Sequence, residues 1–532
     1  MRIELEPTLY QSFEDISDPS NVAPRIASLR AKMAEAGIDA FLVPLADAHR
    51  GESLPDSEQR LAYISGFTGS AGIAIVSKNK AALFVDGRYT LQAPAQTDTS
   101  IFEVLKVPDD KLNDWIINNL PDGAKLGFDP WLHTPDEVKN LNKIPAEKCT
   151  PVPVKNLIDA IWNDRPAPPK GEVEMLGTNR AGISREDKLA DLQQILSEEN
   201  TDTLVLTLPE SINWLFNIRG RDVPNTPVVL GFAIVPKTGK PSLFIDQEKL
   251  NKTQIDQLST FLDIVPEDQF AEALKTLGTN GARVWVDPAS CPNAVLDILA
   301  EGGACLIKKT DPNILPKAIK NAAELAGMRE AHRLDGIAMA KFLCWFDLHC
   351  ETGLLSEIDI ASALEAFRRQ ESTLVDISFD TISGSGPNGA IVHYRVTNSS
   401  NRKLIPGELM LVDSGGQYLS GTTDITRTMF TGSVTTEQKD HNTRVLKGMI
   451  AITIMQFLPK TTGAHLDVLA RQFLWQVGLN YNHGTGHGVG AFLSVHEGPA
   501  SISPLNNVKL EKGMILSNEP GYYLEGEYGI RI

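Results

Sequence analysis

The first apolar pattern along the chain has the spacing of an α-helix. Between Pro24 and Gly37, apolar residues stand three or four positions apart and so share one helix face. Proline is tolerated in the first turn of a helix, and glycine favours the position just past its end, so these two residues are predicted to bound it. The polar residues 1–20 show no such spacing and are predicted to form a loose arm.

Strand patterns follow this helix, and the whole order of elements then recurs. A short apolar run over 38–44 predicts a strand, and two apolar stretches around a polar turn within 72–89 predict a hairpin. The same patterns return as a helix over 188–196, a strand over 202–208 and a hairpin over 231–246. The offset between matching positions is nearly constant, at 159 to 163 residues, which predicts two copies of one α/β unit.

The pattern changes near residue 316. Apolar residues at helical spacing predict a long helix over 321–349, and Ser356 with Asp359 has the sequence of a capping box that begins another helix. Strands and then helices are predicted in blocks over 408–413, 423–430, 435–457 and 464–477. Such blocks are typical of an α+β domain.

Length and patterning together predict three domains. At about 150 residues per domain, a chain of 532 residues is long enough for three or four. We expect α/β domains over 1–160 and 161–316, followed by an α+β domain over 317–532. The proline-rich stretch 163–172 is predicted to link the two α/β copies.

Composition and charge narrow the class of protein. Apolar residues make up 42% of the chain and charged residues 22%, which excludes a disordered or fibrous protein. A formal net charge of −17 argues against nucleic acid or an anionic membrane as a partner. The N-terminus lacks the basic and apolar regions of a signal peptide, and the longest apolar run, near 449–458, is shorter than the ~20 residues that span a bilayer. Five cysteines without a C-x-x-C pair fit neither a disulfide framework nor a zinc ribbon, so we expect a cytoplasmic protein.

Two aspartates stand where a pair of strands would bring them together. Asp413 and Asp424 lie on the strands predicted over 408–413 and 423–430, which flank a turn-rich stretch. A hairpin would place the two carboxylates near each other across the strands. Neighbouring carboxylates repel unless a proton or a cation lies between them. The pair is therefore either part of a metal site or two solvated aspartates at strand ends.

Histidines gather in the same part of the chain. Six of the ten lie between residues 393 and 496, and four of these six stand in the segments AIVHY, HGTGHGVG and SVHEGP. His483 and His487 are four residues apart, but the glycines around them disfavour a helix, so a strand or loop would present both on one side. With His496 and its neighbouring carboxylate, we interpret this group as a site rather than as isolated core or surface histidines.

Several motifs in this region resemble those of the pita-bread metallopeptidases: GPNGAIVHY, VDSGGQY, GTTDITRT, HGTGHGVG, HEGP and NEPGYY. Within that group the chain most resembles the long, three-domain Xaa-Pro aminopeptidases, because SGFTGSAG, VDGRYTLQA, WNDRP, INWLFNIRG and FRRQ also match their N-terminal domains and helices. The resemblance covers nearly the whole chain. It implies two creatinase-like N-terminal α/β domains followed by a pita-bread catalytic domain.

By position, the resemblance implies four metal ligands and five further catalytic residues. Asp413 would chelate one ion, Asp424 would bridge two ions, and His487 would bind the other ion, which Glu519 would join. The residues that match substrate-side positions or positions behind the ligands are His393, His483, His496, Tyr523 and Arg531. The implied cofactor is a pair of divalent metal ions, and an oxygen-rich ligand set suits Mn²⁺.

The resemblance also implies an activity, which is removal of the first residue from short peptides with proline at position two. The attacking group would be a hydroxide that bridges the two metal ions. An Xaa-Pro bond is a tertiary amide without an N–H, so a dedicated pocket is expected. A binding module without catalysis and a prolidase-type dipeptidase remain alternatives, although intact ligands favour an enzyme. We expect a cytoplasmic homodimer without a nucleic-acid or membrane partner.

A fifth ligand is expected just past the last residue of the sequence. In the family, a bridging glutamate directly follows a strand that reads Gly-Ile-Arg-Ile or Gly-Ile-Arg-Val, and residues 529–532 match that strand. We therefore expect that the catalytic domain is truncated at its end, with four of five ligands present. The 532-residue chain as it stands is then expected to be inactive.

Overall fold

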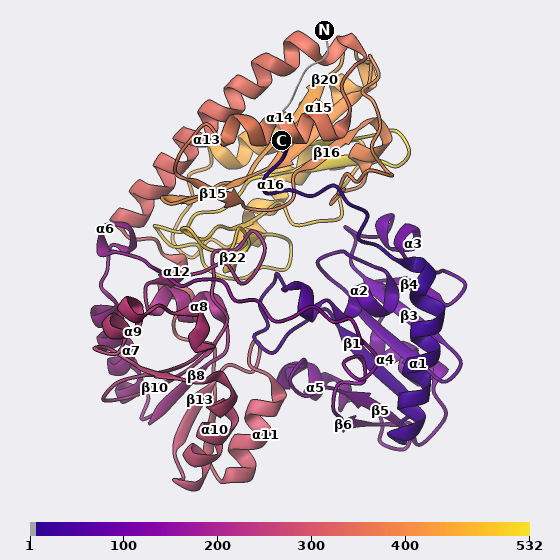
Figure 1. Cartoon of the computed structure of the whole chain (residues 1–532). Helices are drawn as coiled ribbons and strands as arrows, with labels where there is room; N and C mark the ends of the chain where they lie inside the picture. Colours follow the sequence, from indigo (N-terminus) through magenta and orange to yellow (C-terminus); the bar gives the residue numbers. More distant parts are fainter. Residues whose placement is uncertain (1–6) are drawn as a thin grey trace. The chain divides into compact units, whose positions relative to one another are not determined.

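Two six-stranded sheets with the same strand order occupy residues 16–314 (Figure 1). The computed structural model describes residues 7–532. The first sheet has the order β4-β3-β2-β1-β5-β6, in which β2 pairs antiparallel with both neighbours and the other pairs are parallel. Its strands are β1 (Ala40–Pro44), β2 (Ile73–Ser77), β3 (Ala81–Val85), β4 (Phe102–Lys106), β5 (Ala124–Phe128) and β6 (Cys149–Pro153).

The second sheet repeats the first strand for strand. Its order is β12-β11-β10-β8-β13-β14, and here β10 pairs antiparallel with both neighbours while the other pairs are parallel. Its strands are β8 (Thr203–Leu206), β10 (Phe232–Pro236), β11 (Ser242–Phe244), β12 (Asp263–Val265), β13 (Arg283–Val286) and β14 (Cys305–Lys308). The predicted duplication of one α/β unit is therefore confirmed.

Amphipathic helices cover these sheets. The predicted first helix, α1 (Val22–Glu35), begins slightly before Pro24 and ends just before Gly37, whose φ of +66° lies in the left-handed region. Its counterpart in the second copy is α7 (Arg185–Glu198), capped by the Ser184 side chain. Further helices here are α2 (Arg60–Ser65), α3 (Gln92–Gln96), α4 (Leu112–Asn119), α5 (Pro135–Leu141), α6 (Thr178–Ala181), α8 (Pro209–Leu215), α9 (Lys252–Leu258), α10 (Phe270–Thr279) and α11 (Asn293–Gly302), and β7 (Glu174–Met175) pairs with β9 (Ile218–Arg219).

Capped helices organise the part of the chain after residue 314. The long helix α13 (Ala322–His349) begins at a capping box between Asn321 and Glu324. The predicted capping box of Ser356 and Asp359 is confirmed at the start of α14 (Glu357–Arg368). The other helices of this region are α12 (Ile314–Ala318), α15 (Thr436–Thr453) and α16 (Gly463–Trp475).

The helix predicted to run to residue 457 ends at Thr453, so that prediction is wrong at its C-terminal end. Its start is as predicted, because the Thr435 side chain accepts a hydrogen bond from the Gln438 N–H in a capping box. Beyond Thr453 the apolar side chains are exposed, Ile454 by 72% and Leu458 by 80%, so no packing stabilises further turns. Pro459 also disfavours a helical conformation at the residue before it.

Short antiparallel sheets carry the motif residues of this region. The predicted pairing of 408–413 with 423–430 is confirmed as β17 against β20, in a sheet of order β16-β17-β20. The stretch between them is more than a turn, since β18 and β19 lie in it and join the sheet β15-β18-β19. The bounds are β15 (Leu374–Ile377), β16 (Ile382–Ser385), β17 (Leu409–Ser414), β18 (Gly416–Tyr418), β19 (Gly421–Thr422) and β20 (Ile425–Phe430), with two further pairs, β21 (Gly486–Gly488) with β22 (Glu497–Ile502) and β23 (Gly521–Leu524) with β24 (Tyr528–Arg531).

The N-terminal arm, here residues 7–15, is bound along its length to the region after residue 314, so the predicted loose arm is wrong for these residues. The backbone N–H of Leu9 donates to the buried Glu365 carboxylate at 2.5 Å. Gln11 and Thr381 exchange two hydrogen bonds, of 3.2 and 3.0 Å. A polar pattern without periodicity could not reveal partners more than 350 residues away in sequence. Residues 16–20 of that prediction belong to the unit Ile16–Ile314, where the Ser17 hydroxyl donates to the Gly66 carbonyl at 2.8 Å, so they are not loose either. Residues 1–6 lie outside the described residues.

Contacts group the chain into two compact units, Ile16–Ile314 and Leu315–Ile532, with the arm up to Asp15 belonging to the latter. This grouping does not separate the two α/β copies, so the boundaries predicted at residues 160 and 316 stay predictions. Within residues 7–532, none of the helices combines the length and the apolar character that a membrane span requires.

Candidate metal centre

Paired strands bring Asp413 and Asp424 to one face of a sheet. β17 and β20 run antiparallel with Asp413 opposite Thr426. Asp424 stands two residues before Thr426, so both aspartates project to the same side. Burial raises the pKa of Asp413 to about 6; the charge of Arg531 opposes the shift, and those of Asp424 and Glu519 add to it. The two carboxylates are therefore close together, as predicted.

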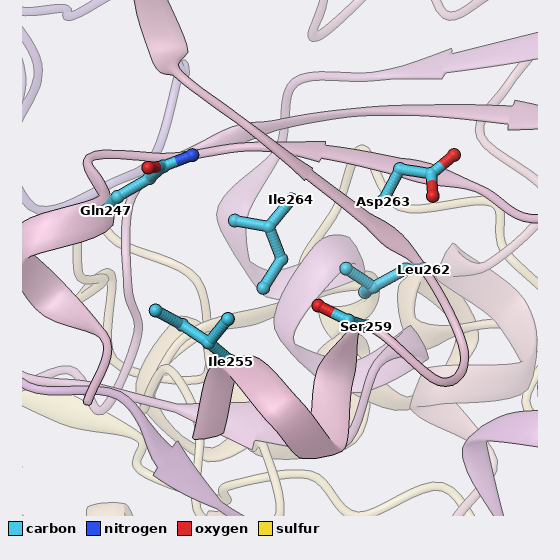
Figure 2. A pocket seen from close by; sticks show the side chains of 6 residues that line it. All are labelled: Gln247, Ile255, Ser259, Leu262, Asp263 and Ile264. Carbon is cyan, nitrogen blue, oxygen red and sulfur yellow. The ribbon is translucent and has the colours of Figure 1, made fainter. Parts of the chain in front are cut away.

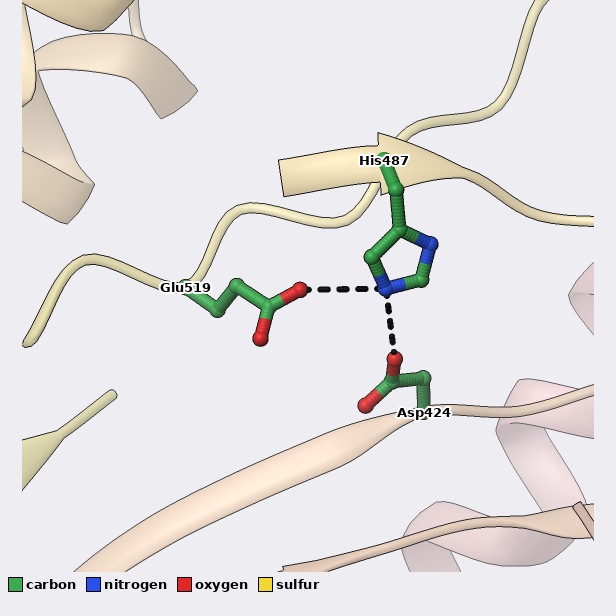
Figure 3. Close-up of side chains that lie close together, drawn as sticks. All are labelled: Asp424, His487 and Glu519. Atoms are coloured by element: carbon green, nitrogen blue, oxygen red, sulfur yellow. Dashed lines mark ion pairs between the residues drawn. The ribbon is translucent and has the colours of Figure 1, made fainter. Parts of the chain in front are cut away.

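His487 and Glu519 lie beside Asp424 because two stretches of backbone run alongside each other. The Ser517 N–H donates to the His487 carbonyl and the Glu519 N–H to the Thr485 carbonyl, each at 2.8 Å. His487 Nε2 then lies 3.2 Å from Asp424 Oδ2 and 3.1 Å from Glu519 Oε1 (Figure 3). One ligand atom from each of the three residues lies within 4.8 Å of the other two.

The orientation and charge of His487 follow from its neighbours. Its Nδ1 lies 2.9 Å from the Gly488 carbonyl, so Nδ1 carries a hydrogen and Nε2 faces the carboxylates. Burial acts to lower the pKa of His487, but hydrogen bonds and charge interactions with Asp424 and Glu519 outweigh it and raise the pKa well above its usual value. Burial likewise acts to raise the pKa of Glu519, and His487 holds that pKa well below its usual range. Without a metal ion, a proton on Nε2 thus supplies the positive charge between the carboxylates.

A chain of hydrogen bonds runs from Asp413 through β24 and β23. Arg531 Nε and Nη2 donate to Asp413 Oδ2 at 3.0 and 2.8 Å, and Nη1 donates to the Tyr523 hydroxyl at 2.6 Å. His483 Nε2 lies 2.9 Å from the same hydroxyl, while its Nδ1 lies 2.7 Å from the Gly484 carbonyl. Burial and the charge of Arg531 lower the pKa of His483 to about 4, so this ring is neutral. Its Nε2 therefore accepts a hydrogen bond from the Tyr523 hydroxyl.

His496 stands against a predicted metal ligand. Its ring meets the His487 ring edge-on, with centroids 4.2 Å apart. The carboxylate beside it, Glu497, takes no part in the cluster, because it is buried in ion pairs with Lys317, at 3.0 Å, and with Lys320. Sequence reasoning missed these two lysines, which anchor the start of β22.

His393 lies on the loop after the 3-10 helix Gly386–Ala390 and is half-buried. That helix packs tightly on β24, since a Cβ on Gly529 would lie 1.7 Å from the Gly389 carbonyl oxygen. Only glycine permits such a close approach of two backbones. The loop of His393 and the strand of Arg531 are therefore held together, but a role for His393 at the cluster stays a prediction.

A fully buried ion pair supports both aspartate strands from behind. Arg368 on α14 and Asp335 on α13 are both inaccessible to solvent and lie 2.6 Å apart. Arg368 donates to the Ser414 hydroxyl at 3.0 Å, and the Thr423 hydroxyl donates to Asp335 at 2.6 Å. Ser414 and Thr423 directly neighbour the two aspartates in sequence. The FRRQ motif contained Arg368, but sequence reasoning assigned it no role.

The donor set fits a divalent cation. Asp413 Oδ1 is buried and accepts no hydrogen bond from any residue in the described range. A buried carboxylate oxygen without a partner is costly, and a cation would satisfy it. Carboxylates with one imidazole form a hard ligand set, suited to metals such as manganese rather than to soft thiolate-bound ions.

A separate pocket in the unit Ile16–Ile314 lacks such a set of metal-binding side chains. It has a volume of about 300 Å³ and lies beside α9 and β12 (Figure 2). Its lining residues are Gln247, Ile255, Ser259, Leu262, Asp263 and Ile264. A single carboxylate among amide, hydroxyl and aliphatic side chains offers no metal cluster, so the chemistry of interest lies at Asp424, His487 and Glu519.

Comparison with known proteins places this geometry in a family. Residues 326–532 match Metallopeptidase family M24, and residues 25–161 and 164–324 each match a Creatinase/Prolidase N-terminal domain. Aminopeptidase P2 from Arabidopsis thaliana is 39% identical, over 96% of this chain and 77% of its own length. Xaa-Pro aminopeptidase 1 from Dictyostelium discoideum is 36% identical, over 96% and 84%.

A solved structure agrees over the same span. X-prolyl aminopeptidase from Caenorhabditis elegans, described as a cytosolic enzyme with a di-nuclear active site, matches with a TM-score of 0.91 and 34% identity, covering 96% of this chain and 86% of that one. The chain belongs to the Xaa-Pro aminopeptidases of metallopeptidase family M24. Membership in this family confirms the predicted fold, with two creatinase-type N-terminal domains and a pita-bread catalytic domain.

We predict that Arg531→Met destabilises the metal-free aminopeptidase by about 3–5 kcal/mol, because it leaves the buried Asp413 carboxylate without its cationic partner. Chemical denaturation in the presence of a chelator measures this loss. Arg444→Met, which removes a more exposed ion pair with Asp440, is the matched control and should cost much less. Equal effects of the two substitutions would contradict the assigned importance of the Arg531–Asp413 pair.

Proposed function

We propose that this protein is a metal-dependent aminopeptidase that hydrolyses the N-terminal Xaa-Pro bond of short peptides. The observation that carries the proposal is the meeting of Asp424, His487 and Glu519 within 4.8 Å of one another, beside the unpartnered Oδ1 of Asp413. Relatives that cover 96% of the chain, and are named for this activity, support it. We favour it over a non-catalytic binding module because an assembled ligand cluster has no evident use in one.

We propose that Asp413, Asp424, His487 and Glu519 are ligands of a centre of two divalent metal ions, with Mn²⁺ as the preferred metal. The di-nuclear active site of the Caenorhabditis elegans enzyme supports the number of ions, and the oxygen-rich donors support the choice of metal. When bound, such ions lower the pKa of bound water and polarise a scissile carbonyl. Arg531 occupies only one oxygen of Asp413, which leaves Oδ1 as the ligand atom.

The residues around the ligands are proposed to manage charge and protons during hydrolysis. Tyr523 receives a hydrogen bond from Arg531 and donates its own proton toward His483 Nε2, so this proton can shift between oxygen and nitrogen as charge develops nearby. His496, edge-on to His487, is placed to donate a hydrogen bond to a substrate oxygen. His393 is proposed to act on the substrate side as well.

We propose that the enzyme works in the cytoplasm as a homodimer and binds neither nucleic acid nor membranes. The five free cysteines and the cytosolic relative support the compartment. The net charge of −17 supports the absence of nucleic-acid binding. Exposed apolar side chains on α15 and α16, such as Ile450 and Trp475, offer a surface that a second copy could cover.

Protein expressed from the complete coding sequence is expected to release arginine from an Arg-Pro-Pro peptide when Mn²⁺ is added. A chelator should abolish the release, and added Mn²⁺ should restore it. An Arg-Ala-Pro peptide is the matched control and should stay intact, while cleavage of Xaa-Pro dipeptides alone would indicate a prolidase. Protein that binds two Mn²⁺ ions yet leaves every Xaa-Pro peptide intact would show that the proposal is wrong.

Substitutions are expected to separate ligands from substrate-side residues. Asp424→Asn should empty the metal site, because the amide loses the charge that two cations share. His496→Ala should keep its metal and slow turnover about a hundredfold, a loss of ~3 kcal/mol in transition-state stabilisation. Metal analysis of the purified variants, together with kcat, distinguishes the two classes. Depleted metal in His496→Ala would make His496 a ligand instead.

We also propose that a polypeptide restricted to residues 1–532, which has four of the five expected ligands, binds at most one metal ion tightly and is essentially inactive. Three ligand atoms converge on one position, and two cations roughly 3.5–4 Å apart repel unless carboxylates bridge them. Metal titration and an Xaa-Pro assay of this polypeptide test the idea. Two tight sites and full turnover would overturn it.

A further inference from the structure

The N-terminal arm is attached to its own unit through a buried carboxylate and a buried amide. Glu365 on α14 receives the backbone N–H groups of Leu9, Tyr10 and Gln11, at distances from 2.5 to 3.4 Å. Gln11 is 5% exposed and is tied to Thr381 in both directions. These contacts fix the register of the arm, so its following residues meet defined partners.

Those partners belong to the His393 loop, residues 391–400. The Asn398 N–H donates to the Phe13 carbonyl at 2.8 Å. Arg395 donates to the Ser12 carbonyl at 2.7 Å and to the Glu14 carbonyl at 2.9 Å. The arm therefore clasps the loop through backbone carbonyls on both sides of Phe13.

Phe13 itself packs into a small apolar cluster beneath the loop. The cluster contains Tyr394 and Val396 from the loop, together with Ile382 and Leu411. Leu411 lies on β17 two residues before Asp413, so it shares a face with that aspartate. Phe13 thus bridges the residues that directly follow His393 and the strand that carries a proposed ligand.

The other side of the loop is held by a buried glutamate. The Tyr394 hydroxyl donates to Glu357 at 2.8 Å, and Glu357 also accepts from the Ser385 N–H and the Asn388 side chain. Residues 391–400 contain no helix or strand, so their shape depends on such contacts. The loop is gripped between Glu357 and the arm, with His393 next to Tyr394.

We propose that the N-terminal arm, chiefly through Phe13, is a positioning element that fixes His393 for catalysis without touching metal or substrate. The proposal rests on the proposed function only in that His393 serves the substrate side. A misplacement of a catalytic group by about 1 Å costs on the order of a hundredfold in rate. Loosening the loop therefore lowers kcat and leaves the metal ligands in place.

Phe13→Ala, made in protein expressed from the complete coding sequence, is expected to lower kcat for an Xaa-Pro peptide by about ten- to a hundredfold at unchanged metal content. Phe13→Leu, which keeps an apolar side chain in the cluster, should recover most of the rate. The matched control is Leu9→Ala, because Leu9 is 66% exposed and contributes its backbone N–H rather than its side chain. Unchanged turnover in Phe13→Ala, or equal losses in Phe13→Ala and Leu9→Ala, would overturn the proposal.

A double-mutant cycle tests whether Phe13 acts through His393. If it does, Phe13→Ala combined with His393→Ala should be no slower than His393→Ala alone. Independent losses that multiply would show that the arm stabilises the unit in general and does not position this histidine. Loss of metal from Phe13→Ala would contradict the positioning role in the same way.

Limited trypsin digestion supplies a readout that does not depend on activity. Arg395 is tied to the arm and to Asp380, so cleavage after Arg395 should be slow in the unmodified protein and in Leu9→Ala, and at least about tenfold faster in Phe13→Ala. If the unmodified protein cleaves no Xaa-Pro peptide, the proposed function fails while this digestion still reports on the arm. Equal cleavage after Arg395 in all three proteins would refute the clasp itself.

Discussion

Mutual repulsion among three carboxylates is the constraint on which the catalytic unit depends. Asp413, Asp424 and Glu519 gather in a largely buried place, where water screens their charges only weakly. The chain counters this repulsion with Arg531 on one aspartate and with a proton on His487 between the other two groups. A cation that replaces that proton would relieve the same repulsion, so the site is built around positive charge.

Holding such a site together requires strands and loops that are fixed in place by further contacts. Each proposed ligand lies on or beside a paired strand, and the two aspartate strands are tied from behind to the buried pair of Arg368 and Asp335. Glu497 and two lysines anchor the strand after His496, and the N-terminal arm clasps the loop of His393. Charged groups buried in this way are costly alone, and the ion pairs and hydrogen bonds that they make hold these strands and this loop in place.

Much of the fold and of the candidate site could be predicted because both depend on local sequence patterns. Apolar periodicity and turn residues specified each copy of the duplicated unit, and the capping box of Ser356 and Asp359 marked a helix start from residues three apart. Asp413, Asp424, His487 and Glu519 stand in short motifs, so their chemistry was visible before their geometry was. The helix end at Thr453 and the bound arm were mispredicted, because exposure and distant partners leave no periodic trace.

The sequence by itself determined the doubled α/β unit, the capped helices and the identity of the residues with ligand chemistry. Only the tertiary structure decided that Arg531 takes one oxygen of Asp413 and leaves the other without a partner. It also decided that Glu497, beside His496, forms ion pairs with two lysines and takes no part in the cluster around His487. The same holds for the position of Phe13 under the loop of His393. The physical reason is that charge pairing and side-chain packing act across space between residues that neither spacing nor periodicity connects.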